Sequence, residues 1–64
     1  MSLYYVQTTY GTCCIVSAKN ERDARGVIAD EIGKNNISLV RGATKDDIAE
    51  VKAMGGYIPN EVKP

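Results

Sequence analysis

The chain has 64 residues, with eight basic and eight acidic side chains, two cysteines and no histidine. A chain of this length forms one domain at most, and its core buries only about 60% of the surface that the unfolded chain exposes. Balanced charge disfavours bulk nucleic acid as a partner, and two cysteines without histidine leave too few ligands for a tetrahedral zinc site.

Residues 1–18 contain no charged side chain, and the first predicted elements lie there. Residues 3–9 and 12–18 are rich in β-branched and aromatic side chains, and they flank Tyr10 and Gly11. This pattern predicts a hairpin with Tyr10-Gly11 as a two-residue loop, although a loop of another length would change the register. The expected cross-strand pairs are Thr9–Thr12, Thr8–Cys13 and Val6–Ile15.

Side chains alternate along a strand, so this register divides the hairpin into two faces. The first face carries Leu3, Tyr5, Gln7, Cys14, Val16 and Ala18. The second face carries Tyr4, Val6, Thr8, Cys13, Ile15 and Ser17.

The stretch NERDARGVIADEIGKN, residues 20–35, predicts a helix. Asn20 suits the N-cap and Asp23 the third helical position, while Gly33 suits the C-terminal end. Gly26 lies outside the apolar stripe and weakens the helix by about 0.5–1 kcal/mol relative to alanine. Either this weakness is tolerated, which we favour, or another backbone approaches the helix closely at this position. The stripe itself consists of Ala24, Val27, Ile28 and Ile32.

Residues 36–42, NISLVRG, predict a third short strand, with Ile37 and Leu39 on the same face. Residues 44–56, TKDDIAEVKAMGG, predict a second helix with Thr44 as N-cap and Asp47 at the third helical position. We therefore expect one domain over residues 1–58, followed by a loose C-terminal tail, 59–64.

The element order is β-β-α-β-α, which indicates a small α+β domain. We expect a single three-stranded sheet, with the third strand parallel to the second and both helices packed on one face. The third strand can lie beside the first strand or beside the second, and we favour the order 2-1-3. In an alternative arrangement the second helix covers the opposite face, which gives three layers. The expected core is Tyr5, Cys14, Val16, Val27, Ile28, Ile32, Ile37, Leu39, Ile48 and Val51.

Cys13 and Cys14 are the residues most suggestive of chemistry. Neighbouring side chains in a strand point to opposite faces, so the two sulfur atoms cannot share a metal or act as a dithiol, and we expect free thiols with Cys14 in the core. No histidine is present to act as a base beside a nucleophile. We therefore expect no catalytic residue, no metal site and no cofactor, and the sequence disfavours an enzyme.

The uncharged hairpin is the most informative feature for function. If both helices cover one face, nothing in the chain covers the other, and an uncovered apolar face usually marks an interaction surface. The hypothesis is a non-enzymatic interaction module of regulator or inhibitor type, which binds a second copy of itself as a homodimer or docks on another protein. The predicted interface residues are Tyr4, Val6, Thr8, Cys13 and Ile15.

Two alternatives remain open. The four tyrosines could stack on the bases of single-stranded nucleic acid, although the hairpin supplies no basic side chain beside them. A small ligand-binding protein could form its pocket between two subunits. The chain has neither a signal-peptide pattern nor an apolar run long enough to span a membrane, so we expect a cytoplasmic location.

Overall fold

The computed structural model describes residues 1–59. The strands are β1 (Ser2–Thr8), β2 (Cys13–Ala18) and β3 (Ile37–Gly42), and the α-helices are α1 (Glu21–Ile32) and α2 (Lys45–Ala53). One turn of 3₁₀-helix, Lys34–Asn36, precedes β3. These elements confirm the predicted α+β class and element order.

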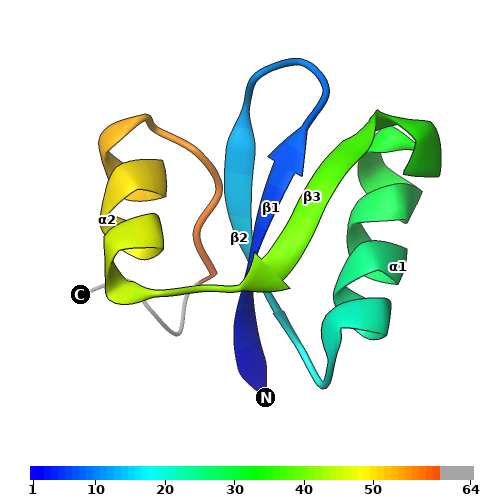
Figure 1. Cartoon of the computed structure of the whole chain (residues 1–64), viewed down its shortest axis with the longest axis horizontal. Coiled ribbons are helices and arrows are strands. Elements are labelled where there is room, and N and C mark those ends of the chain that lie inside the picture. The colour runs from blue at the N-terminus through cyan, green and yellow to red at the C-terminus, as the bar shows by residue number, and fades with distance from the viewer. Residues whose placement is uncertain (60–64) are drawn as a thin grey trace.

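The strands form a single sheet in the order β2-β1-β3 (Figure 1). The central strand β1 is antiparallel to both of its neighbours, so β2 and β3 run parallel to each other. The predicted strand order and relative direction are therefore confirmed.

The hairpin register differs by one residue from the predicted register. Val6 pairs with Cys14, where the sequence predicted Ile15 as its partner. The reason is a loop of three residues between Thr8 and Thr12, which are joined by a hydrogen bond of 2.9 Å from the Thr8 N–H to the Thr12 carbonyl. Gly11 closes this loop with a φ of 86°, a conformation that glycine adopts without strain.

The Thr8 side chain stabilises the longer loop. Its Oγ1 accepts hydrogen bonds from the backbone N–H groups of Tyr10, at 3.2 Å, and Thr12, at 3.3 Å. It also lies 2.7 Å from the Thr12 Oγ1. Because these bonds connect both ends of the loop to one buried hydroxyl, they favour three loop residues over two.

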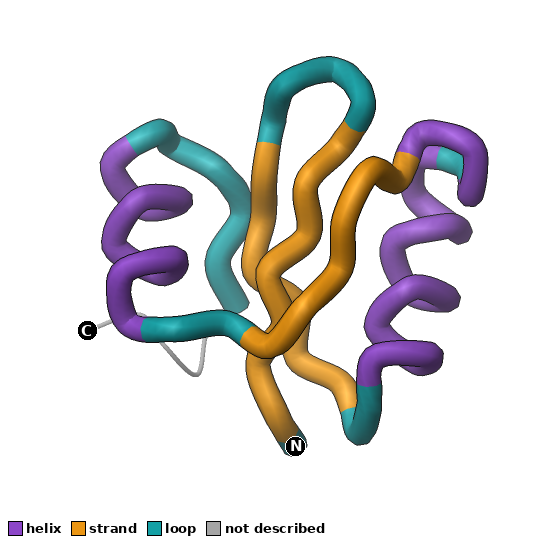
Figure 2. Tube along the Cα trace, in the orientation of Figure 1, coloured by secondary structure: helices purple, strands orange, loops and turns teal. Residues whose placement is uncertain are grey.

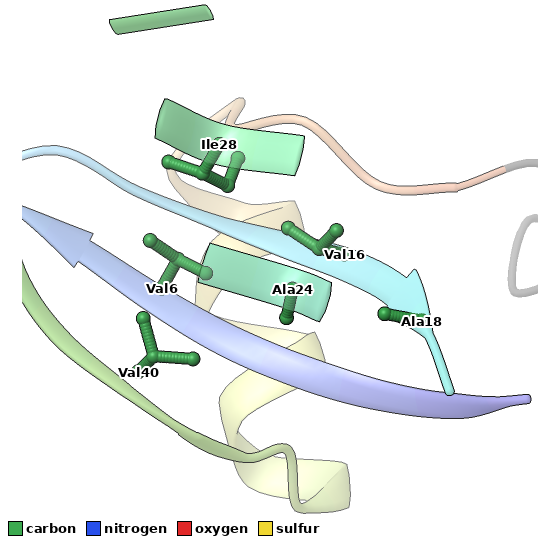
Figure 3. Close-up of a cluster of buried hydrophobic side chains, with 6 residues drawn as sticks. All are labelled: Val6, Val16, Ala18, Ala24, Ile28 and Val40. Atoms are coloured by element: carbon green, nitrogen blue, oxygen red, sulfur yellow. The ribbon is translucent and has the colours of Figure 1, made fainter. Parts of the chain in front are cut away.

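The sheet has two apolar faces, and the register determines which residues share each of them. Val6 now shares a face with Cys14 and Val16, while Ile15 shares the other face with Tyr5. We call the two resulting clusters the first core and the second core. The buried members of the first core are Val6, Val16, Ala18, Ala24, Ile28 and Val40 (Figure 3). The buried members of the second core are Tyr5, Cys13, Ile15, Val51 and Ile58.

One helix packs against each core, so the expectation that both helices cover one face is wrong. Ala24 and Ile28 of α1 belong to the first core, and Val51 of α2 belongs to the second. Figure 1 shows α1 and α2 on opposite sides of the sheet, which is the three-layer arrangement that the sequence left as an alternative. Two apolar sheet faces require two covers, and the chain supplies one for each.

Local signals at the helix ends are confirmed. The Asn20 side chain accepts a hydrogen bond of 2.8 Å from the Asp23 N–H at the start of α1, and Gly33 follows its end with a φ of 86°. At the start of α2, Thr44 and Asp47 form a complete capping box. These caps depend on residues only three positions apart, so the sequence alone determines them.

A bulge in the β1–β3 ladder changes the predicted faces of β3. Thr8 pairs with Ile37 and Gln7 with Leu39, so the intervening residue has no partner on β1. Ile37 consequently packs against the first core, whereas Leu39 is 38% exposed. Leu39 and Val27, which is 49% exposed, are the two predicted core residues that the structure places at the surface.

Residues 55–59, which we call the strap, leave α2 and run along the outer edge of β2 (Figure 2). The Ile15 N–H donates a hydrogen bond of 3.0 Å to the Tyr57 carbonyl. A Cβ atom on Gly56 would lie 2.5 Å from the Cys13 carbonyl oxygen, so this close approach requires glycine. Ile58 and Pro59 are buried, and the rest of the predicted tail lies outside the described residues.

Candidate functional site

The five predicted interface residues do not form a surface. Val6 and Ile15 are completely buried and belong to different cores on opposite faces of the sheet. Thr8 and Cys13 are each only 8% exposed, and Tyr4 is half-buried beside the first core. The uncharged hairpin therefore lies at the centre of the molecule. The prediction that one of its faces is open is wrong, because each face packs into a core.

The two cysteines lie on opposite faces of β2, as predicted, and both are free thiols. Their depths are reversed from the prediction, because Cys13 is buried and Cys14 is half-buried. The Cys13 Sγ lies 3.8 Å from the Met54 Sδ. Within residues 1–59 no cluster of three or more acidic, cysteine or histidine side chains could hold a metal ion.

A polar network connects the end of β3 to the start of α2. The Arg41 guanidinium donates two hydrogen bonds to the Asp47 carboxylate, of 2.6 and 2.8 Å, and lies 4.7 Å from the centre of the Tyr5 ring. The hydrogen bonds from Arg41 and the Thr44 backbone lower the pKa of Asp47 below its ordinary value. Burial, with a contribution from nearby Cys13, raises the pKa of Tyr5.

This network has a structural role. Asp47 is buried, and each of its carboxylate oxygens accepts a hydrogen bond from Arg41. Its Oδ2 also accepts a hydrogen bond of 2.9 Å from the Thr44 N–H. A carboxylate with this many donors is satisfied and ionised, so it has little tendency to accept a proton from a substrate. The network fixes α2 against the sheet.

A groove of about 820 Å³ lies between α1, the outer edge of β2 and the strap. Its volume lies within the range of about 300–1,000 Å³ that is usual for binding sites. The apolar lining comes from Cys14 and Val16 of β2, Val27, Ile28 and Ile32 of α1, and Tyr57 of the strap. Thr8, Thr12 and Ser17 add hydroxyl groups, and Glu31 is the charged residue among those that line it.

The groove places a thiol and a carboxyl group among apolar side chains. Burial, with a smaller contribution from Cys13, raises the pKa of the Cys14 thiol, so the reactive thiolate form is disfavoured. Glu31 is exposed, as its position in the last turn of α1 predicts, and it makes no hydrogen bond or ion pair with another described residue that would poise it as a base.

Two exposed apolar side chains line this groove. They are Val27 of α1 and Tyr57 of the strap, which is 65% exposed, and we call these two residues the apolar patch. Met54 is also exposed, but its sulfur contacts Cys13 on the opposite face of the sheet. Among residues 1–59 the other exposed large apolar residues are Met1, Tyr10 and Leu39.

The sequence did not identify this site. Val27 was assigned to the core because it follows the helical stripe, and Tyr57 was given no role between the second helix and the tail. A signal was present in Gly55-Gly56, because two glycines after a helix allow the chain to turn back tightly against a strand. The predicted residues Thr8 and Cys13 do line the groove, together with Cys14.

The tyrosines do not share a stacking surface. Tyr5 is buried, Tyr4 is half-buried, and the exposed Tyr10 and Tyr57 lie in separate segments of the chain. Both sheet faces carry a helix, so the sheet offers no open platform of the kind on which bases stack.

Comparison of the chain with known protein families, with curated proteins and with solved structures finds no match in any of the three. No helix within residues 1–59 has the length and apolar character needed to cross a membrane.

Proposed function

We propose that the protein is a non-enzymatic interaction module that holds apolar side chains of a protein partner in the groove beside β2. The observation that carries this proposal is the position of the exposed apolar residues. Val27 of α1 and Tyr57 of the strap are exposed and both line an apolar hollow, on a surface where a monomer that binds nothing would favour polar side chains.

The composition of the surface favours a protein partner. Tyrosine is enriched at protein interfaces, and charged side chains are depleted at their centres. The apolar patch contains no charged residue, and Glu31 stands at the edge of α1, where it can stay in water. A nucleic-acid partner would require basic side chains, and the groove lining has none.

Selection of peptides on the immobilised native protein tests the proposal. We expect the selected peptides to carry two or more large apolar side chains, and to shift the amide NMR signals of Cys14, Val16 and Ile32. Val27→Lys places a charge on one wall of the groove at an already exposed position, and it should weaken peptide binding at least about tenfold, which corresponds to about 1.4 kcal/mol.

Ala49→Lys is the matched control, because it adds the same charge to an exposed position of α2 that does not line the groove. This variant should bind the peptides as the native protein does. Peptides that bind equally to native protein and Val27→Lys, or no enrichment of peptides at all, would contradict the proposal. Salt-dependent binding of single-stranded oligonucleotides in place of peptides would favour the nucleic-acid alternative.

A further inference from the structure

We infer that the partner segment in the groove carries a lysine or arginine beside its apolar anchor, and that Glu31 binds this basic side chain. The inference rests on the proposed function, because it names the chemistry of the partner at the same site. It follows from the charge of the groove, from the place of that charge at the end of α1, and from its distance to the apolar lining.

The charge of the groove has one sign. Glu31 is the charged residue among those that line it, and its side chain is exposed at the surface. Within residues 1–59 no lysine or arginine forms an ion pair with it. Its carboxylate therefore attracts a basic side chain of a partner and repels an acidic one, which is how charge at the rim of an interface selects between partners.

The end of α1 adds to this negative charge. The last turn of a helix carries a partial negative charge and favours basic side chains. The last turn of α1 instead contains Asp30 and Glu31 and no basic residue, and Lys34 beyond it forms no ion pair with Glu31. Glu31 thus opposes the helix dipole without a compensating ion pair in the described chain, and a position that breaks a local rule in this way is typical of a functional site.

The spacing between the apolar lining and Glu31 matches the spacing of side chains along a peptide. Val27 and Glu31 are four residues apart on α1, so they lie on the same side of the helix and about 6 Å apart along its axis. Side chains two residues apart in an extended segment, or four residues apart in a helix, share one side at about the same separation. A segment that places an apolar side chain beside Val27 therefore brings the side chain at one of these positions to Glu31.

The opposite end of the groove has no such preference for charge. A second hollow of about 560 Å³ adjoins the groove there and shares Ser17 and Val27 with it. The charged side chains that line this second hollow are two basic and two acidic residues, Lys19, Arg22, Asp23 and Asp30. Because these charges balance, selection by charge occurs at the Glu31 end, and the basic residue of the partner lies on that side of its apolar anchor.

Parallel selections from one random peptide library test the inference, with immobilised native protein, Glu31→Gln, Glu31→Lys and Glu21→Gln as targets. On native protein we expect lysine or arginine to be enriched about threefold at the position two or four residues from the large apolar side chain. Glu31→Gln should lose this enrichment, and Glu31→Lys should replace it with an enrichment of aspartate or glutamate. Circular dichroism confirms that each variant is folded.

Glu21→Gln is the matched control, because it removes the same charge from an exposed position of α1 that does not line the groove. Glu21 lies about 15 Å from Glu31 along the helix, which exceeds the screening length of about 8 Å at physiological salt. The peptides selected on this variant should match those selected on native protein.

Titration of one selected peptide measures the contact directly. Exchange of its basic residue for glutamine should raise the dissociation constant about threefold on native protein and leave it unchanged on Glu31→Gln. Salt at about 0.5 M should remove most of the difference on native protein, because the contact is exposed to solvent.

Peptides that depend on Val27 but show no preference for a basic residue would overturn the inference and leave the proposed function intact. A preference that Glu31→Gln and Glu21→Gln weaken equally would overturn it as well, since the attraction would then come from the protein as a whole. Failure to enrich any peptide on native protein would refute the proposed function and the inference with it.

Discussion

The two cores of this protein are stabilised by different means. The first core joins aliphatic side chains of all three strands to α1, a helix of 12 residues. The second core contains Tyr5 and the Cys13 thiol, and its helix α2 has nine residues. A capping box, an ion pair and a closely fitted glycine reinforce the second core. Polar contacts hold the shorter helix α2 against the sheet, whereas apolar packing holds the longer helix α1.

Truncation of one central side chain in each core should have the largest effect. Ile15→Ala truncates a fully buried side chain of the second core and Ile28→Ala a buried side chain of the first, and each should lower the free energy of unfolding by about 2–5 kcal/mol. A chain of this size has a total free energy of unfolding of about 3–10 kcal/mol, so each variant should lose a large share of its stability at 25 °C. Urea titration followed by circular dichroism measures the losses. A loss below half a kilocalorie in either variant would show that its core is wrongly assigned.

Gly56→Ala should weaken the second core alone. Its new Cβ would lie 2.5 Å from the Cys13 carbonyl oxygen and 2.8 Å from the Val51 Cγ1, so the strap must move away from β2. Crowding of this kind typically lowers stability by about 1–3 kcal/mol. Hydrogen exchange should then accelerate at the Ile15 N–H, whose bond partner is on the strap, and should stay slow at amides of α1. Unchanged exchange at Ile15 would argue against the close fit.

Acid should also weaken the second core. Because the folded-state pKa of Asp47 is lowered, the stabilisation it contributes is complete above its unfolded pKa of about 3.9 and disappears as the pH falls through that value toward the folded pKa. The melting temperature should therefore decrease between about pH 5 and pH 2, and Asp47→Asn should remove part of that decrease. Asp46→Asn is the control, because it removes a neighbouring charge that has no bond to Arg41. An equal effect of both variants would contradict the role of the network.

The smallest expected effect is a gain on the side of the first core. Gly26 lies inside α1, and a Cβ atom there would meet nothing within 4 Å. Gly26→Ala should therefore raise the free energy of unfolding by about 0.5–1 kcal/mol, through lower backbone entropy in the unfolded chain. A loss of stability measured by urea titration would instead indicate that another chain approaches the helix at this position.

The parts of the fold that depend on near neighbours were predictable. Asn20 with Asp23, and Thr44 with Asp47, mark the helix starts within four residues, and Gly33 marks an end. The hairpin register was not predictable in the same way. It depends on whether Gly11 closes a loop of two or three residues, and the Thr8 hydroxyl decides this through contacts that exist only in the folded loop.

The predicted interface depended on the placement of the helices. An apolar face was expected to stay uncovered because both helices were expected on one face of the sheet. In the structure both faces are apolar, and each is covered by a different helix. Val27 and Leu39 match the periodicity of core residues yet lie at the surface, because periodicity identifies a face of an element but not how far its neighbours extend over it.

The central position of β1 has a consequence for the order of folding. Its partner β2 ends at Ala18, whereas its other partner β3 begins only at Ile37, after α1. A hairpin closes in about 1–10 µs, and pairing over a longer separation is slower because more chain entropy must be lost. We therefore expect β1 and β2 to meet first, α1 and β3 to complete the first core next, and the strap to close the second core last. Pulsed hydrogen exchange during refolding should then show the Val6 amide protected before the Ile15 amide, because the Ile15 N–H bonds to the Tyr57 carbonyl of the strap.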